Sequence, residues 1–304
     1  MINQPLVSVV IPTYKRPAET LRAVESVIDQ DYSNIEIIVV DDNDDNSHYY
    51  DTKHKLTSYI ETGVLSYVKY RGNKGGSFAR NRGVEVSSGI LIAFLDSDDE
   101  FVPYKLSCQV NRFIENEKKY DLVAVTCNRT RFNNGIFCDA SNNSGLVDDP
   151  LPILTRQRDL GGSSVLLMRR SVYEDIGGFD ERLKRQQDVD LYLRLLQRGI
   201  ILAMPESLVK VNVDDRSSIP TTSVYIENQD YFIKKHLQNF SSCERSKEKL
   251  VIKYSKIDIA KVALRNKNIF IALDYLFRAG INFKDVPFLY GAIGNYIRRY
   301  LLKR

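Results

Sequence analysis

Residues 90–100 read ILIAFLDSDDE, an apolar run that ends directly in a cluster of carboxylates. The apolar residues 90–95 are typical of a strand buried on both faces of a parallel sheet. Comparable runs at residues 6–11, 35–40 and 64–69 predict three more strands. Ligands bind beyond the carboxyl ends of the strands in such sheets, so the polar residues that follow each run are the candidates for function.

Helical patterns separate these strands. Pro17 opens a helix whose apolar positions recur at helical spacing, and residues 76–87 form a second helical segment. The alternation of strand and helix predicts an α/β fold with a doubly wound, mostly parallel sheet. Further along the chain, residues 133–150 are rich in Asn, Asp, Gly and Ser and predict a mobile loop. Residues 163–168 favour another strand, and residues 188–198 a helix.

The C-terminal part differs from the rest in pattern and in charge. Its pattern is helical from residue 223 onward, so we divide the chain into an α/β domain at residues 1–220 and a helical C-terminal region at residues 221–304. Residues 241–304 carry 14 basic and 5 acidic side chains, although the formal net charge of the whole chain is only +4. A basic tail on an acidic body predicts contact with an anionic membrane surface and disfavours nucleic acid as a partner. A solvated, lysine-rich helical face is the open alternative.

Composition excludes several classes of protein. Hydrophobic residues make up 43% and charged residues 27% of the 304 residues, which excludes disordered, collagen-like and coiled-coil chains. The sequence shows no signal peptide and no apolar run of about 20 residues. We therefore expect a cytoplasmic protein that could also lie on the inner face of the plasma membrane. Four cysteines lie far apart, which predicts buried reduced thiols.

The carboxylates after residue 95 indicate a cation site. Asp96, Asp98 and Asp99 leave a hydrophobic strand together, and carboxylate oxygens are the ligands that Mg²⁺ and Mn²⁺ prefer. A cation held there would neutralise the charge of a bound diphosphate. The alternative is an acidic turn that caps a helix near Pro103.

A glycine-rich segment lies just upstream of these carboxylates. Residues 72–83 read GNKGGSFARNRG, a turn that leads into a helix with two arginines. Backbone N–H groups, Lys74 and Arg80 could approach an anionic ligand there. The segment has neither the spacing of a phosphate-binding P-loop nor that of a dinucleotide-binding G-x-G-x-x-G motif. A plain loop followed by a solvated helix start is the alternative.

Five ordered segments give the sequence a resemblance to a known family. They are VSVVIPTY at residues 7–14, VVDD at 39–42, GSFARNRG at 76–83, FLDSDD at 94–99, and GGFDERL at 177–183 followed by QDVDL at 187–191. Together they resemble the inverting family-2 glycosyltransferases with the GT-A nucleotide-sugar-binding fold. The resemblance implies that residues 1–220 are a catalytic domain that transfers a sugar from a UDP-sugar donor. The acceptor would be a glycan or a lipid-linked oligosaccharide in bacterial surface polysaccharide synthesis.

The resemblance also implies roles for individual residues on the donor side. Asp41 would accept a hydrogen bond from the uracil N–H, and Asp96 would reach the ribose. Asp98 and Asp99 would hold Mn²⁺ or Mg²⁺ on the diphosphate. The full set expected to bind the nucleotide is Pro12, Thr13, Tyr14, Arg16, Asp41, Lys74, Arg80, Asp96 and Ser97.

On the acceptor side the resemblance assigns Asp188 as the general base. A carboxylate opposite the leaving group implies direct displacement with inversion, and its place in the first turn of a helix favours the ionised form. Gly162, Ser163 and Gln187 would border the acceptor, with Gln187 standing where the family usually has glutamate. The family's histidine after the last strand is also missing. Asp214, Asp215 and Arg216 occupy that region instead, which leaves the third metal ligand open.

Two other functions stay open at this point. A sugar nucleotidyltransferase uses a similar sheet and acidic site, but residues 12–16 lack the glycine that its loop requires. A catalytically silent sugar-nucleotide or glycan-binding scaffold is favoured by Gln187 and by the missing histidine. The basic, aromatic stretch at residues 295–304 predicts contact with a membrane, with the catalytic domain or with a second subunit in a homodimer.

Overall fold

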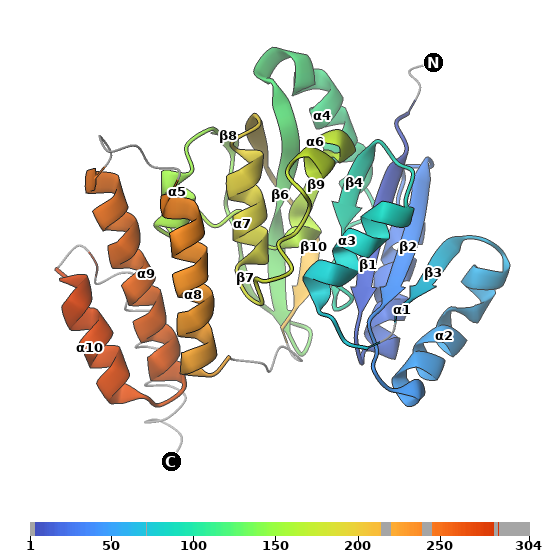
Figure 1. Cartoon of the computed structure of the whole chain (residues 1–304). Coiled ribbons are helices and arrows are strands. Elements are labelled where there is room, and N and C mark those ends of the chain that lie inside the picture. Colours follow the sequence, from blue (N-terminus) through green and yellow to red (C-terminus); the bar gives the residue numbers. More distant parts are fainter. Residues whose placement is uncertain (1–3, 71, 214–219, 239–244, 283–284, 286–304) are drawn as a thin grey trace. The chain divides into compact units, whose positions relative to one another are not determined.

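The computed structural model describes residues 4–70, 72–213, 220–238, 245–282 and 285, and the chain forms two compact units (Figure 1). One unit comprises residues 1–150 and 159–215, and the other comprises residues 151–158 and 216–304. Two parts of the sequence analysis lie outside the described residues: the region of Asp214, Asp215 and Arg216, where the third metal ligand was left open, and the tail at residues 295–304.

The first unit is built on one mixed sheet. Its first four strands follow the order β3-β2-β1-β4 and run parallel, which confirms the predicted α/β fold with a mostly parallel core. The order continues with β9-β6-β10-β5, in which β9 is antiparallel to both of its neighbours and β6 and β10 are parallel. The bounds are β1 (Val7–Thr13), β2 (Ile35–Asp41), β3 (Leu65–Lys69), β4 (Leu91–Phe94), β5 (Asp99–Phe101), β6 (Leu122–Asn133), β9 (Leu166–Arg169) and β10 (Ile200–Asn212).

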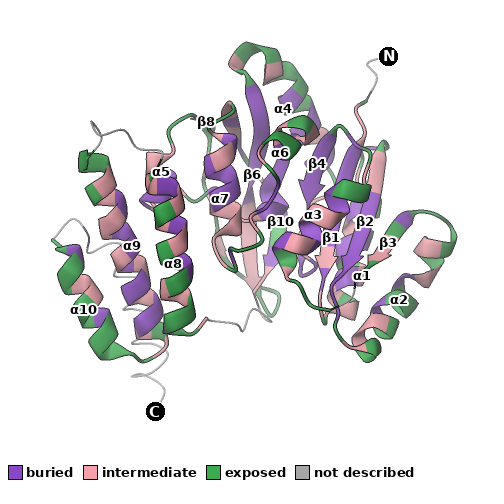
Figure 2. Ribbon diagram, in the orientation of Figure 1, coloured by how far each residue is buried: buried purple, intermediate pink, exposed green. Residues whose placement is uncertain are grey.

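Alternate residues of the central strand pack on opposite layers of helices. Val9 of β1 belongs to a core cluster with Val24 and Leu56, which lie on α1 (Pro17–Ile28) and α2 (Asn46–Glu61). The same cluster includes α4 (Lys105–Tyr120). Val10 faces α3 (Gly76–Val86) on the other side, and it lies so close that a Cβ atom at Gly83 would be 2.2 Å from its Cγ1. Figure 2 shows the resulting buried sheet between helices with exposed outer faces.

This division of the helices predicts a crevice at one edge of the sheet. The helices that follow β1 and β2 cover one face, whereas α3, which follows β3, covers the other. The change of face occurs between β1 and β4, which are neighbours in the sheet. A crevice forms beyond the carboxyl ends of the strands at such a point, so this edge is where the fold favours ligand binding.

The structure corrects the prediction of a mobile loop at residues 133–150. That segment contains β7 (Ile136–Ala140), which forms a hairpin with β6, and β8 (Gly145–Val147), which pairs with β10. The turn of the hairpin is Asn134-Gly135, and both residues have positive φ angles, of 48° and 73°. Two such residues match a type I′ turn, the commonest connection of a two-residue hairpin. Cys138 is exposed on this hairpin, so the prediction that all cysteines are buried is wrong.

A 3₁₀ turn and two helices complete the first unit. A 3₁₀ turn, η1 (Ser163–Val165), precedes β9, so the predicted strand at residues 163–168 starts only at Leu166. After β9 come α6 (Arg170–Asp175) and α7 (Gln187–Leu195), the latter close to the predicted helix at residues 188–198.

The second unit is helical. It contains α5 (Leu151–Leu154), α8 (Thr222–Leu237), α9 (Arg245–Arg265) and α10 (Ile269–Ala279). Arg156, which follows α5, pairs with Asp258 of α9 at 2.8 Å. Phe270 and Phe277 of α10 are 90% and 87% exposed. Within the described ranges, no helix has both the length and the apolar content that a membrane crossing requires.

Candidate active site

Three parallel strands deliver polar residues to the crevice edge. Thr13, at the end of β1, pairs in register with Asp41 at the end of β2. Asp96 comes two residues after β4, the other neighbour of β1. The hydroxyl of Thr13 is buried and lies 2.6 Å from that of Thr20, so it holds the start of α1 against the sheet.

Asp41 is fully buried at the base of this edge. Its carboxylate accepts hydrogen bonds from the Tyr67 hydroxyl and, at 2.7 Å, from the backbone N–H of Asn43. The Lys69 ammonium lies 3.4 Å away. Burial and the hydrogen bond to Asp41 raise the pKa of Tyr67 well above its ordinary value, so the tyrosine stays a donor. The Asp41 carboxylate is thereby fixed in direction.

Asp42 is a site residue that the sequence analysis did not single out. Its carboxylate accepts from the backbone N–H groups of Lys74 and Gly75, at 2.9 and 2.7 Å, and is 4% exposed as a residue. Burial raises the pKa of Asp42. Gly75, with a φ of 95°, is the N-cap of α3, so Asp42 fixes the glycine-rich turn and the direction of that helix. Its place in the quoted VVDD segment was the available signal.

Arg80 of α3 pairs with the turn at residues 96–99, which we call the acidic turn. It is 6% exposed, donates from Nη2 to Oδ1 of Asp96, and lies with its guanidinium carbon 5.3 Å from the centre of the Phe179 ring. Its Nε and Nη1 atoms are buried without a hydrogen-bond partner. Buried donors normally have partners, so these N–H groups are candidates to bind an anionic ligand.

Asp98 follows in the turn before β5, and Asp99 is the first residue of that strand. A guanidinium nitrogen of Arg16 lies 2.8 Å from Oδ2 of Asp98, and Oδ2 of Asp99 accepts from the Ser164 hydroxyl at 2.7 Å. Both aspartates are nearly buried, at 5% and 3% exposure. Ser164 is a second residue that the sequence analysis missed, although it adjoins the predicted Ser163.

The chemistry of this turn fits a divalent cation. Within the described part of the chain no three acidic, histidine or cysteine side chains gather as a ready-made metal cluster. Mg²⁺, however, is often held by only one or two carboxylates together with phosphate oxygens. The Arg16 guanidinium on Asp98 stands in for a cation, because it supplies positive charge to the same carboxylate oxygen. Asp98 is therefore the residue best placed to hold the metal.

Asp188 is the second residue of α7 and faces Arg80 and Asp96. Gln186, at a φ of 62°, precedes the helix as its N-cap, so Asp188 does not cap it. Leu191 and Leu195 are buried at 1% and 0% exposure and anchor the helix.

The electrostatics of Asp188 differ from the expectation. Burial raises its pKa to about 6; Arg80 and a hydrogen bond from the backbone N–H of Ser163 act in the opposite direction, whereas Asp96 adds to the rise. Burial therefore outweighs the helix dipole that was expected to favour the ionised form. Oδ1 of Asp188 is buried and accepts no hydrogen bond from a described residue. A carboxylate with a free oxygen and a pKa near neutrality is suited to take a proton.

The predicted acceptor residues lie beside Asp188. A Cβ atom at Gly162 would lie 3.8 Å from Oδ2 of Asp188, an ordinary contact distance, so this glycine borders the carboxylate. The Ser163 hydroxyl donates to Oδ1 of Asp96 at 3.1 Å. Gln187 is the half-buried first residue of α7.

The remaining predicted residues have other surroundings. The Tyr14 hydroxyl contacts Asp44 at 3.3 Å, and the exposed Lys74 places its ammonium 4.6 Å from the centre of the Phe78 ring. Ser97 is buried within the acidic turn, and Pro12 lies within β1. The residues joined by close contacts are thus Arg16, Arg80, Asp96, Asp98, Asp99, Ser163 and Asp188.

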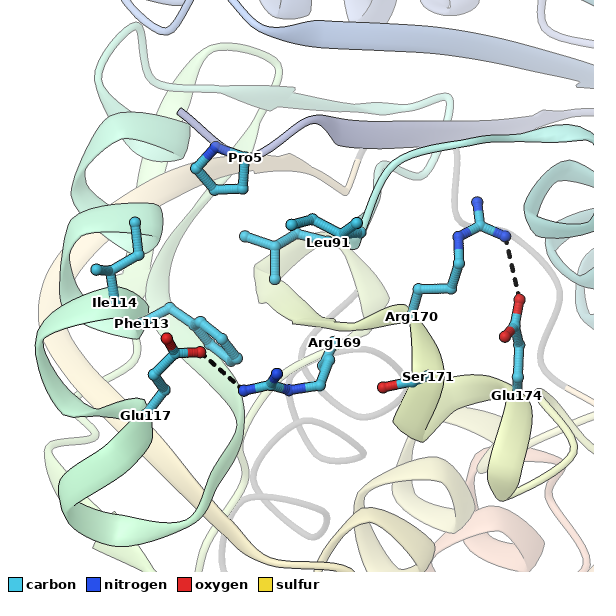
Figure 3. Close-up of a pocket in the computed structure, with 10 residues that line it drawn as sticks. Pro5, Leu91, Phe113, Ile114, Glu117, Arg169, Arg170, Ser171 and Glu174 are labelled. Carbon is cyan, nitrogen blue, oxygen red and sulfur yellow. Dashed lines mark hydrogen bonds and ion pairs between the residues drawn. The ribbon is translucent and has the colours of Figure 1, made fainter. Parts of the chain in front are cut away.

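A cavity of about 540 Å³ lies elsewhere in the first unit (Figure 3). It is lined by Pro5 and Leu91, which lie at the amino ends of β1 and β4, and by Phe113 of α4. Its two arginines are paired: Arg169 with Glu117 at 2.8 Å and Arg170 with Glu174 at 3.2 Å. The cavity is therefore at the edge opposite the acidic turn and is separate from the candidate active site.

Comparison with known proteins gives a family match. Residues 8–177, more than half of the chain, match the sequence model of glycosyl transferase family 2. An uncharacterized glycosyltransferase of Rickettsia bellii is 28% identical over 212 residues, which cover 68% of this chain and 29% of that protein. The putative colanic acid biosynthesis glycosyl transferase WcaA of Escherichia coli K12 is 29% identical over 203 residues, covering 64% of this chain and 68% of WcaA.

Solved structures show the same fold. S. aureus TarS superposes with a TM-score of 0.64 at 18% identity, covering 97% of this chain and 49% of TarS. The structure of TarS residues 1–349 in complex with UDP-GlcNAc gives a TM-score of 0.64 at 17% identity, over 96% of this chain and 81% of that one. The mannosyltransferase PcManGT of Pyrobaculum calidifontis, in complex with GDP-Man and Mn²⁺, gives 0.61 at 16% identity, over 97% of this chain and 81% of that one.

Proposed function

We propose, since this chain belongs to glycosyl transferase family 2, that it transfers a sugar from a UDP-sugar to a glycan acceptor, with inversion and with the help of a divalent cation. The observation that carries the proposal is that a buried arginine with free N–H donors and a carboxylate with a free oxygen lie close together at the crevice edge. Arg80, with two unpartnered buried donors, faces the acidic turn, and Asp188, with an unpartnered oxygen, faces Arg80.

The donor side follows from the charges in the turn. Loss of a nucleoside diphosphate develops negative charge on phosphate oxygens, and fixed donors aimed at that charge lower the barrier. Arg80 and Arg16 supply such donors, and Asp98 would hold Mn²⁺ or Mg²⁺, which acts as a Lewis acid on the diphosphate. The complexes of structural neighbours with UDP-GlcNAc and with GDP-Man and Mn²⁺ support a nucleotide-sugar donor.

The acceptor side requires a base. The acceptor hydroxyl oxygen bonds to the anomeric carbon, the bond from that carbon to the diphosphate breaks, and UDP leaves with the electron pair. Asp188 takes the hydroxyl proton, for which a pKa of about 6 is well suited near neutral pH. A base on the face opposite the leaving group gives a product of inverted configuration.

The product is inferred from a relative. The name of WcaA refers to colanic acid biosynthesis, which supports a bacterial surface polysaccharide as the product.

The place of the reaction is inferred from the C-terminal region. Phe270 and Phe277 of α10 are exposed, and residues 241–304 are strongly basic. Apolar and basic side chains together favour binding to an anionic membrane, where a lipid-linked acceptor would be presented. Co-sedimentation with vesicles of anionic and of neutral lipid tests this part, and dimerisation would appear as a doubled mass in light scattering.

The central experiment measures release of UDP from a panel of UDP-sugars with Mn²⁺ and candidate acceptors. We expect release from at least one donor, its abolition by EDTA and its restoration by Mn²⁺. Tight UDP binding without turnover for any donor and acceptor would contradict the proposal and favour a silent binding protein. Release of pyrophosphate from UTP and a sugar phosphate would favour a nucleotidyltransferase.

A further inference from the structure

Lys105, the first residue of α4, is fully buried. Its ammonium donates to Oε1 of Gln109, one turn along the helix, at 2.7 Å and lies 3.9 Å from the centre of the Phe101 ring. No carboxylate among the described residues forms an ion pair with it. Burial lowers the pKa of Lys105 to about 8. Because buried charges are normally paired, a lysine here needs a reason other than stability.

Gln109 supplies that reason. It too is fully buried, and its Nε2 donates to the backbone carbonyls of Val165 at 2.9 Å and Val125 at 3.4 Å. Because the amide nitrogen serves both carbonyls, the amide oxygen must point the other way, where Lys105 is its donor. Without Lys105 that oxygen would be buried and unsatisfied, and a flipped amide would set oxygen against oxygen.

The carbonyl that Gln109 holds belongs to the turn behind the candidate active site. Val165 is the last residue of η1, whose serines contact the acidic turn. Ser164 donates to Asp99 at 2.7 Å and Ser163 to Asp96 at 3.1 Å. The backbone N–H of Ser163 also donates to Asp188. One turn of backbone therefore connects three carboxylates of the site to the Lys105–Gln109 pair.

We infer that Lys105 and Gln109 are positioning residues of the active site. They fix the Ser163–Val165 turn from inside the core, and the turn in turn orients Asp96, Asp99 and Asp188. The kinetic consequence of this role rests on the proposed glycosyl transfer. The structural consequence, a fixed turn, does not.

Lys105→Met separates positioning from stability. Methionine fills a similar volume and removes the cost of a buried charge, which offsets the cost of the unsatisfied Gln109 oxygen, so the variant should unfold close to the wild-type temperature. Its kcat should fall about ten- to a hundredfold, more than the donor KM rises, because small displacements of catalytic groups slow the chemical step. Gln109→Leu should act alike, and the double variant should be no slower than either single variant, since the two residues act as a unit.

Tyr32→Phe is the matched control. It removes a buried hydrogen bond, from the Tyr32 hydroxyl to the Pro5 carbonyl at 2.5 Å, at the opposite edge of the sheet, and should leave kcat unchanged. A wild-type kcat in Lys105→Met, or a loss of kcat that matches a loss of thermal stability, would overturn the inference.

A crystal structure of Lys105→Met gives a readout that needs no activity. We expect the Ser164 hydroxyl to lie beyond hydrogen-bond distance of Asp99, and an unmoved turn would overturn the inference. If the wild-type protein released UDP from no donor, the proposed function would be wrong, but the position of the turn in this variant would still decide the role of the pair.

Discussion

Asp188 shows how one residue's surroundings set its chemistry. Burial raises its pKa from 3.8 to about 6 against the opposing effects of Arg80 and of the Ser163 backbone. A base works only when deprotonated, so we expect kcat/KM for glycosyl transfer to fall as the pH drops below about 6. A pH–rate profile of the wild-type protein checks this. A rate independent of pH between about 5 and 8 would speak against Asp188 as the base.

Asp188→Asn should be slower and yet more stable. Removing the base should lower kcat by about 10²–10⁴-fold. The folded carboxyl keeps its proton up to about pH 6 and the unfolded one only up to 3.8, so the native state binds more protons between these values. This contribution to stability is lost as the pH rises through that window, and at pH 7 the neutral amide should raise the free energy of unfolding by roughly 1–2 kcal/mol. Urea unfolding measures the second effect, and a less stable variant would contradict the burial argument.

Arg16 competes for the carboxylate that would hold the metal. Its guanidinium lies 2.8 Å from Asp98, so Arg16→Ala should strengthen Mn²⁺ binding in the absence of nucleotide by about tenfold, whereas Asp98→Ala should abolish it. Electron paramagnetic resonance of free Mn²⁺ reports both affinities. Arg22→Ala, an exposed substitution on the helix that follows Arg16, is the control. An Arg16→Ala protein with wild-type affinity would show that the two cations do not compete.

The sequence identified those residues whose position follows from the strands. Asp41 and Asp96 come directly after apolar runs, so the edge on which they lie could be predicted. The roles of Asp42 and Ser164 were missed, because they depend on hydrogen bonds to residues 32 and 65 positions away. Lys105 was missed for a similar reason: nothing in its local sequence shows that it is buried.

Among the elements, α3 carries Arg80 into the crevice because it packs closely on the sheet. A Cβ atom at Gly83 would lie 2.2 Å from Cγ1 of Val10, so Gly83→Ala must push the helix outward. We expect a loss of about 1–3 kcal/mol in the free energy of unfolding and a higher donor KM. Val86→Ala, at a half-exposed position of the same helix, should change neither. Wild-type stability in Gly83→Ala would show that the space between α3 and β1 can accommodate a methyl group.

The β6–β7 hairpin shows that two turn residues can predict more than the composition of a whole segment. The polar composition of residues 133–150 favoured a loop, but Asn134-Gly135 is itself a specific signal for a tight hairpin. Composition describes solvent exposure, whereas the positive φ angles of these two residues set the direction of the chain. The hairpin was therefore predictable from these two residues, whereas the average composition of the eighteen-residue segment concealed it.

For the whole molecule, Arg156 connects the short segment at residues 151–158 to α9 within the second unit. Its ion pair with Asp258 is half-buried, with side-chain exposures of 24% and 14%. Arg156→Met should destabilise this unit by about 1–2 kcal/mol and leave the donor KM unchanged. Arg198→Ala, which breaks an exposed pair with Asp175, should have no measurable effect on stability. Calorimetry of both variants compares the contributions of the two ion pairs to stability. Equal melting profiles would contradict the prediction that only the half-buried pair stabilises the protein.

The sheet beyond β4 shows what local pattern cannot supply. β6 and β10, of 12 and 13 residues, pair with register shifts, and four further strands pair with one or the other of them. Such pairing joins residues about 80 positions apart, and its register is set by contacts rather than by propensity. The parallel half of the sheet was predictable because each of its strands repeats the same local unit.

The salt bridges of Arg16 to Asp98 and of Arg80 to Asp96 already neutralise two of the carboxylates at the crevice edge in the resting structure. A bare ion gains little by entering the crevice, whereas a nucleotide that arrives with its own ion can exchange partners with both arginines at once. In a steady-state assay at fixed total donor, velocity should then track the concentration of the preformed ion–nucleotide complex. Once all of the donor carries an ion, adding more of the metal ion should not raise the velocity further.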